Sequence, residues 1–212
     1  MVYAGPVIVS TAYFPPVQYF SKIVPAQRTI LELHENYSKQ SYRNRCNILS
    51  STGVQTLSVP VQRGSFHKVA LRDLKIEYSK PWQQIHLRSL KTAYSSSAFY
   101  EYMKDDVESC ILKGHTYLLD LNLSILEMLN TTLELGLNIE FSSEYLAYYE
   151  GALDLRDIIH PKREENDAVR NTQSYFQVFS KDNSFVPGLS ILDLMFNMGL
   201  ESLTYLRSCT QE

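Results

Sequence analysis

Segment 32–45 holds most of the residue types from which an active site can be built. Its fourteen residues include two carboxylates, a histidine, a lysine, two arginines and two tyrosines. Glu35 or His34 can act as a general base when the surroundings tune its proton affinity. The guanidinium groups of Arg43 and Arg45 can each bind a phosphate or carboxylate through two parallel hydrogen bonds. We therefore take Glu35 and His34 as catalytic candidates, and five residues as candidates for binding a substrate or its phosphate: Tyr37, Lys39, Arg43, Asn44 and Arg45.

The same segment also has a purely structural interpretation. Runs of charged residues usually lie on a solvated surface, so 32–45 can equally be the polar face of a strand followed by an exposed loop. Both interpretations stay open at this point. Under the first one, Glu32 is a further candidate base.

A second candidate segment, 10–16, follows a short β-branched run and leads into a helical pattern. Ligands of open α/β sheets collect at the carboxyl ends of the strands, and a helix N-terminus offers free N–H groups to an anion. Thr11 and Tyr13 are the candidate substrate-binding residues in this segment. The alternative is a structural turn between strand and helix, held by hydrophobic contacts.

Two polar residues, Asp193 and Asn197, interrupt an otherwise apolar helical pattern at i, i+4 spacing. A carboxylate among so many apolar side chains caps the helix, pairs with a buried cation or faces a pocket. We count both residues as candidates for substrate binding, and a structural role is the open alternative. Trp82 and His86 have the same spacing, for which core packing is the favoured interpretation.

The elements that would position these residues form an α/β pattern. Residues 7–10 and 29–33 are predicted strands. Residues 17–24 follow Pro16, which suits the first position of a helix, and place their apolar side chains on one helical face. Strand, helix and strand in this order predict a βαβ unit with two parallel strands.

The remaining elements extend the sheet and cover it. Residues 45–61 carry a Ser-Ser-Thr-Gly turn and predict a β-hairpin. Residues 72–78 also alternate apolar and polar side chains, so we expect a mixed β-sheet with a helical segment packed on it. The further elements expected are helices at 82–94, 99–111, 118–135 and 189–196, strands at 139–142 and 175–179, and a polar surface loop at 151–173.

The length of 212 residues fits a single domain over residues 1–212. Its first part, 1–80, is mostly sheet-forming, and 81–136 is helical. The last part, 137–212, holds a strand, a polar loop, a second strand and the final helix.

Bulk properties exclude several functional classes. The formal net charge is −3 and the pI is near 6.0, so no nucleic-acid partner is expected. There is no signal peptide, and no apolar run reaches the roughly 18–20 residues that span a bilayer. The three cysteines have no CxxC spacing, so we expect a cytoplasmic protein with free thiols and no membrane partner.

Known local motifs for cofactors and metals are missing from the sequence. The five histidines contain no i, i+4 pair, so no metal site is predicted. Neither a phosphate-binding loop nor a dinucleotide fingerprint occurs, and no motif identifies a cofactor.

Several stretches of the chain, spread over residues 7–206 in order, resemble the WbqC-like protein family. In the opening loop Tyr13, Phe14, Pro16, Tyr19 and Phe20 match the family pattern, whereas Ser10 and Thr11 stand near the places of a family His and Gln. The acidic, Tyr-x-Lys, aromatic-Arg-Asn-Arg pattern of the family is similar to 35–45. Further similar stretches are Val59-Pro60-Val61, Trp82 with His86, Tyr94 and Phe99-Tyr100, then 175–179 and 189–199.

This resemblance implies a bacterial protein of surface-polysaccharide or O-antigen biosynthesis. The activity expected on that basis is transfer of a small acyl or aminoacyl group to an activated sugar, with a phosphate-bearing or nucleotide-sugar small molecule as ligand. The alternative is a non-catalytic ligand-binding or assembly protein of the same pathway. For an enzyme, Tyr13, Glu35, Arg43, Arg45 and Asp193 should converge within about 10 Å around a concave pocket.

Overall fold

A parallel sheet of four strands, in the order β5-β2-β1-β6, carries the segments of interest. The computed structural model describes residues 5–62, 69–162, 173–180 and 184–209. All three neighbouring pairs in this sheet are parallel, so the carboxyl ends of its strands share one edge. The strands are β1 (Val7–Ser10), β2 (Thr29–Glu32), β5 (Ile139–Phe141) and β6 (Leu153–Asp154).

The predicted βαβ unit is confirmed. Helix α1 (Val17–Ile23) connects β1 to β2, and Val7 pairs with Thr29 in the parallel register. Pro16 is the N-cap residue of α1, one position before the first helical position that the sequence analysis gave it. Both strands are buried along their whole length, which explains their continuous apolar and β-branched character.

The predicted hairpin is confirmed as well, but it forms a sheet of its own. Strands β3 (Arg45–Ser50) and β4 (Gly53–Ser58) pair antiparallel, and Gly53 takes the positive φ of the turn. The fold is α/β as predicted, with its parallel and antiparallel strands in two sheets rather than in one.

Segment 72–78 is not the strand that its alternation suggested. A 3₁₀ turn occupies Leu71–Asp73, and the rest makes only isolated bridges, Lys75 with Tyr117 and Ile76 with Val61. The alternation is real because Leu74 and Ile76 are buried and their neighbours are not. It reflects one side packed on the core without a partner strand.

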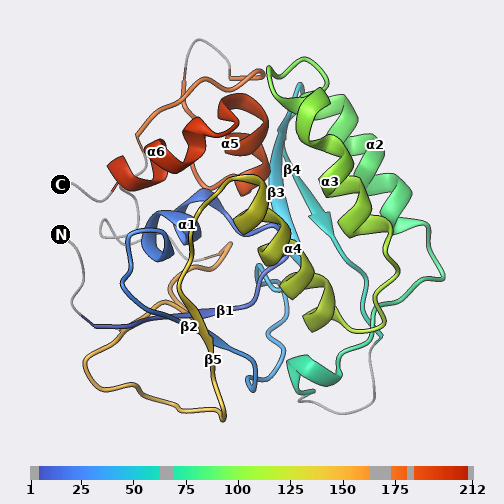
Figure 1. The fold of residues 1–212 in the computed structure, drawn as a ribbon. Coiled ribbons are helices and arrows are strands. Elements are labelled where there is room, and N and C mark those ends of the chain that lie inside the picture. Colours follow the sequence, from blue (N-terminus) through green and yellow to red (C-terminus); the bar gives the residue numbers. More distant parts are fainter. Residues whose placement is uncertain (1–4, 63–68, 163–172, 181–183, 210–212) are drawn as a thin grey trace.

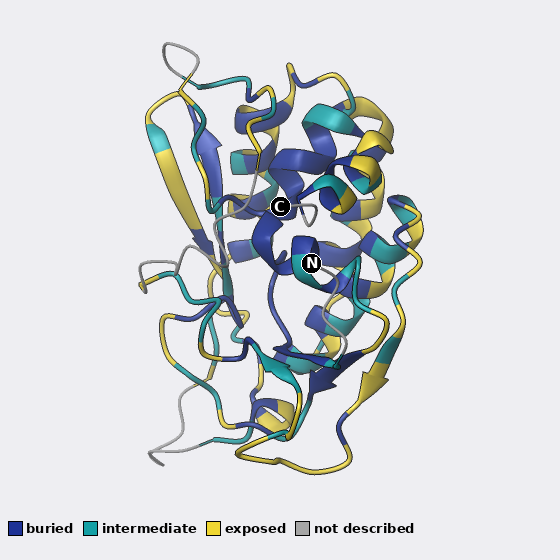
Figure 2. Cartoon of the chain, turned by 90° about the vertical axis from the view of Figure 1, so that its left-hand side faces the viewer, coloured by how far each residue is buried: buried dark blue, intermediate teal, exposed yellow. Residues whose placement is uncertain are grey.

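Helices surround the two sheets (Figure 1). Figure 1 places α2 and α3 side by side on one flank of the hairpin, α4 across the middle of the molecule, and α5 with α6 at the end nearest α1. Figure 2 shows that the buried residues gather where the helices face the interior. The helices are α2 (Trp82–Tyr94), α3 (Tyr100–Leu112), α4 (Leu118–Thr132), α5 (Ile191–Met198) and α6 (Glu201–Ser208).

Two predictions for the last third of the chain were wrong. Residues 175–179 form no strand. The polar stretch that begins at 151 is not only a surface loop, because Leu153–Asp154 forms β6 and the backbone N–H of Leu155 donates to Ile8 O at 2.9 Å. The strand was not predicted because Asp154 and Arg156 made the sequence look like a charged loop. In the structure these two residues form an ion pair with each other. Residues 163–172 of that stretch lie outside the described residues.

Within the described residues, no helix combines the length and the apolar character that crossing a membrane requires.

Candidate functional site

The segments that follow β1 and β2 meet at the carboxyl edge of the parallel sheet. Tyr13 N donates to Tyr42 O at 2.9 Å, which joins segment 10–16 to segment 32–45 by a backbone hydrogen bond. Ser10, the last residue of β1, contacts Glu35 and Arg43 of the second segment. The expectation that both segments share one edge follows from the parallel register, and the contacts fulfil it.

Ser10, Glu35 and Arg43 form a closed triangle of hydrogen bonds. Arg43 Nε donates to Glu35 Oε1 at 2.8 Å, and Arg43 Nη2 donates both to Glu35 Oε2 and, at 2.8 Å, to Ser10 Oγ. Ser10 Oγ in turn donates to Glu35 Oε2 at 3.0 Å. The Arg43 and Glu35 side chains are each only 6% exposed, so this ion pair lies largely out of water.

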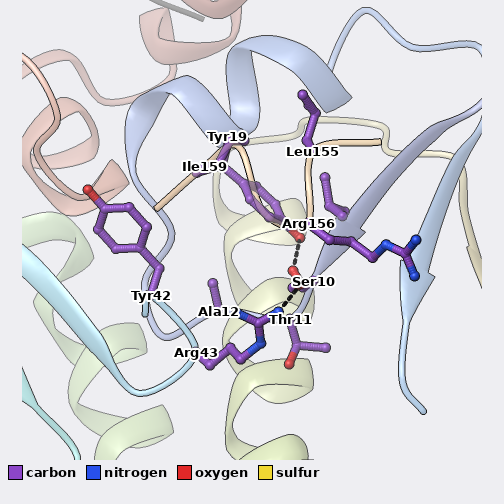
Figure 3. Close-up of a pocket in the computed structure, with 10 residues that line it drawn as sticks. Ser10, Thr11, Ala12, Tyr19, Tyr42, Arg43, Leu155, Arg156 and Ile159 are labelled. Carbon is purple, nitrogen blue, oxygen red and sulfur yellow. Dashed lines mark hydrogen bonds between the residues drawn. The ribbon is translucent and has the colours of Figure 1, made fainter. Parts of the chain in front are cut away.

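A hollow of about 280 Å³, open to solvent on one side, lies beside this triangle (Figure 3). We call it the edge hollow. Its lining comes from the ends of β1 and β6, from α1 and from the segment before β3. The lining residues are Val9, Ser10, Thr11, Ala12, Tyr19, Tyr42, Arg43, Leu155, Arg156 and Ile159.

The polar groups of the edge hollow differ in how many of their hydrogen-bonding positions already have a protein partner. Tyr19 OH donates to Ser10 O at 3.0 Å, and burial, with the nearby Glu35 carboxylate, raises the pKa of Tyr19. Thr11 Oγ1 accepts from Asn122 Nδ2 at 3.3 Å, which leaves the hydroxyl proton of Thr11 available. Across the described ranges, Nη1 of Arg43 has no hydrogen-bond partner. Among these groups, Nη1 of Arg43 is the unengaged N–H donor on a residue that lines the hollow.

A second buried ion pair, Glu32 with Arg156, braces the same edge. Glu32 is fully buried at the end of β2, and Arg156 Nη1 donates to its Oε2 at 3.2 Å. The Arg156 guanidinium also lies 5.3 Å from the ring centres of both Tyr145 and Tyr149. Figure 3 shows this guanidinium pointing away from Ser10, so only the stem of Arg156 lines the edge hollow.

Comparison with known proteins gives the family. Residues 11–163 match the model of the WbqC-like protein family, which is more than half of the chain. The chain belongs to the WbqC-like family. An uncharacterized protein of Mycobacterium tuberculosis is 29% identical over 231 aligned positions, which cover 96% of this chain and 98% of that protein. No solved structure matches the chain.

In this WbqC-like protein His34 lies outside the edge hollow. Its Nε2 is 3.0 Å from Ser142 O, and its Nδ1 is 3.4 Å from Arg72 Nη1. Its backbone N–H donates to Glu32 Oε1 at 2.8 Å. The imidazole is thus directed toward the end of β5, whereas Glu35 faces Ser10.

Four further candidates of segment 32–45 do not line the edge hollow either. Asn44 Nδ2 donates to Val59 O at 2.8 Å, which ties the segment to the strand region after β4. Arg45 begins β3, where it pairs with Ser58. Tyr37 is half-buried and Lys39 is exposed. The compact grouping of these residues in sequence does not carry over into space, because Tyr42 and Arg43 are the residues of this segment that line the hollow, and Glu35 meets it through its contacts with Ser10 and Arg43.

Tyr13, which was predicted to bind substrate, does not line the edge hollow. Its hydroxyl lies 2.8 Å from His86 Nδ1, and its ring packs edge-on against Trp82 and Phe14. Burial raises the pKa of Tyr13 and lowers the pKa of His86 to about 4, against a smaller upward effect of the Ser58 backbone. Tyr13 therefore belongs to the core against α2, and the core interpretation of Trp82 and His86 is confirmed.

Asp193 and Asn197 are also placed away from the edge hollow. Asp193 Oδ2 accepts from Tyr175 OH at 2.7 Å and from Gln177 Nε2 at 3.0 Å. Asn197 Nδ2 donates to Asp193 O at 2.7 Å. Burial raises the pKa of Asp193 in the absence of a cationic partner among these contacts. The pair anchors the segment before α5. With Tyr13, Arg45 and Asp193 all outside the edge hollow, the five residues expected to converge in an enzyme do not gather around it, and Glu35 and Arg43 are the two of that set in contact at this edge.

Sequence analysis missed two residues that shape the site. Arg156 was taken as part of a surface loop, and the signal that would have found it is the short apolar run Leu153-Asp154-Leu155 just before it. Asn122 lies on the apolar face of α4, where it donates to Thr11 Oγ1 and, at 2.9 Å, to Arg43 O. A buried amide on a leucine-rich helix needs polar partners, which pointed to a polar neighbour.

Proposed function

We propose that the edge hollow is the active site of a transferase that moves a small acyl or aminoacyl group onto an activated sugar. The reaction class and the setting in bacterial surface-polysaccharide synthesis come from the family resemblance. The location comes from the geometry of Ser10, Glu35 and Arg43. The ligand of this proposal carries a phosphate, as a nucleotide sugar does.

The observation that supports the proposal most is the unengaged Nη1 of Arg43. Glu35 and Ser10 hold Nε and Nη2 of the same guanidinium, so the group is fixed before any ligand arrives. A guanidinium with two free N–H groups in a poorly hydrated site is well suited to bind a phosphate or carboxylate oxygen.

The size of the hollow limits how the ligand is placed. Its volume of about 280 Å³ counts the open solvent at the mouth, and the enclosed part has room for about one water molecule. One small group of the ligand therefore enters the hollow, while the remainder of a nucleotide sugar stays at the mouth. Glu35 is the candidate general base in this arrangement.

Isothermal titration calorimetry with pyrophosphate, a nucleoside diphosphate and a nucleotide sugar tests the proposal. Arg43→Lys keeps the charge opposite Glu35 but loses the planar pair of donors, so we expect at least about a tenfold loss of affinity. Arg28→Lys is the matched control, because Arg28 forms a similar bidentate pair with Glu140 on the exposed surface. Equal affinities of the wild type and Arg43→Lys, or no binding of any phosphate-bearing ligand, would refute the proposal.

A non-catalytic ligand-binding or assembly protein is the second candidate. It is favoured by the aromatic side chains exposed at the end of β5 and in the segment after it, among them Phe141, Tyr145 and Tyr148, of which Tyr148 is 77% exposed. Amphipathic rings of this kind are frequent in protein interfaces. This candidate predicts that a bound nucleotide sugar is recovered chemically unchanged after incubation with an acyl donor, as mass spectrometry can show.

A further inference from the structure

Ser10 has the surroundings of an activated nucleophile. Its Oγ donates to Glu35 Oε2 at 3.0 Å, within the range over which a base removes a proton from a hydroxyl. Arg43 fixes the base, since its Nε donates to the other carboxylate oxygen at 2.8 Å. Nucleophile, base and a third group that orients the base are thus all in contact.

Arg43 also contacts the oxygen on which negative charge would develop. Its Nη2 donates to Ser10 Oγ at 2.8 Å, and its side chain is 6% exposed. A fixed, positively charged hydrogen-bond donor in a site with little water stabilises an alkoxide more than the same group does in bulk solvent.

Ser10 is held rigidly and still faces the edge hollow. It ends β1, where it pairs with Glu32 of β2, and Tyr19 OH donates to its carbonyl oxygen at 3.0 Å. It is 9% exposed and is one of the residues that line the hollow. A nucleophile on a strand end keeps the position that attack on a carbonyl carbon requires.

We propose that Ser10 is a covalent acyl acceptor, so that this enzyme works through an acyl-serine intermediate. The inference rests on the proposed transferase function and adds its chemical route. Ser10 Oγ attacks the carbonyl carbon of an activated ester or thioester, Glu35 takes the hydroxyl proton, and the bond to the leaving alcohol or thiol breaks as that group receives the proton. An amine or hydroxyl acceptor then attacks the acyl-serine, and Ser10 regains a proton through Glu35.

The edge hollow selects a short acyl group. Apolar side chains of Val9, Leu155 and Ile159 line it beside Ser10. These side chains suit the methyl or short alkyl end of the acyl group, while Arg43 Nη1 can donate to its carbonyl oxygen. The enclosed part of the hollow has room for about one water molecule, so the acyl group must be small. The substrate class is therefore an activated formyl or acetyl donor.

Acetylation by p-nitrophenyl acetate tests this without knowledge of the natural donor. We expect the wild-type protein to release a burst of about one equivalent of p-nitrophenol and to gain one acetyl group on the peptide that contains Ser10. Ser10→Ala removes the burst. Ser50→Ala keeps it and is a matched control, because Ser50 is also 9% exposed and its hydroxyl donates within the hairpin turn, to Gly53 O.

Two further variants make the test independent of a folding defect in Ser10→Ala. Ser10→Cys should carry the acetyl group as a thioester, which hydroxylamine releases. Glu35→Gln keeps the shape of the base but cannot take the proton, so the burst should slow at least about tenfold. Acetylation of exposed lysines occurs equally in all variants and sets the background.

The outcomes separate this inference from the proposed function. A wild-type protein that binds pyrophosphate through Arg43 but is never acetylated at Ser10 overturns the acyl-serine and leaves the transferase proposal standing. Acetylation of Ser10 without any binding of phosphate-bearing ligands supports the nucleophile and overturns the proposed ligand. If the protein neither binds those ligands nor is acetylated at Ser10, both are wrong.

Discussion

Removal of one partner of the Arg43–Glu35 pair should destabilise the fold far more than removal of both. Arg43→Met leaves the Glu35 carboxylate about 6% exposed, with Ser10 Oγ as its one remaining side-chain donor in the described structure. An uncompensated buried charge costs about 3–5 kcal/mol. For a chain of 212 residues, each kcal/mol lowers the melting temperature by about 2–4 °C, so the expected decrease is about 6–20 °C.

The double variant Arg43→Met/Glu35→Leu separates charge from packing. It removes both charges and keeps apolar volume at both positions, so most of the stability should return. The remaining loss is about 1–2 kcal/mol, since Ser10 Oγ then has neither of its partners. Urea denaturation followed by circular dichroism gives the free energies of unfolding. A double variant as unstable as Arg43→Met, or a single variant within about 1 kcal/mol of the wild type, contradicts the buried-pair argument.

Three further predictions concern other charged and titrating groups. Arg156→Met should lower the free energy of unfolding by about 3–5 kcal/mol because it leaves the fully buried Glu32 without its cationic partner. Arg28→Met removes one partner of an exposed pair and should lower the free energy of unfolding by less than about 1 kcal/mol in the same urea titration. Burial raises the pKa of Asp193 above its ordinary 3.8, so its ionisation reduces stability as pH rises through the folded-state pKa. Asp193→Asn should therefore raise the melting temperature more at pH 7 than at pH 4, and equal effects at both would oppose this reasoning. Burial lowers the pKa of His86 from 6.5 to about 4. The neutral form of His86 therefore contributes stability above pH 6.5, and this contribution is lost as pH falls toward 4. An NMR titration midpoint near 6.5 would show that His86 is not desolvated.

Local sequence patterns were sufficient for most of the elements. Val7–Ser10 and Thr29–Glu32 are short apolar runs around a helix that starts after Pro16, and such a unit forms from contacts close in sequence. The meeting of Ser10 with Glu35 follows from the same unit, because parallel neighbours end at one edge. This is why segments 10–16 and 32–45 could be assigned to one site.

The side chains that face the hollow could not be read from the sequence in the same way. Tyr13 lies three positions after Ser10, yet its hydroxyl contacts His86 of α2 and not the groups around Ser10. Arg156 reaches Glu32 across 124 positions of sequence. Periodicity carries no information on such distant partners. The charged residues around 154–165 are typical of a loop, so the sequence did not indicate β6, the strand that pairs with β1.

The arrangement of Glu32 and Glu35 gives the strongest physical reason to look for chemistry at Ser10 rather than elsewhere on this edge. Glu32 ends β2, Glu35 follows it, and both bind a buried arginine. Glu32 accepts hydrogen bonds from His34 N, Ser142 Oγ and Arg156 Nη1, which hold the loops of this edge together. Glu35 accepts from Arg43 and from Ser10, a hydroxyl-bearing residue that lines the hollow. Glu35 is therefore the carboxylate whose hydroxyl partner lies at the hollow, and this difference is the geometric ground for the acyl-serine proposal.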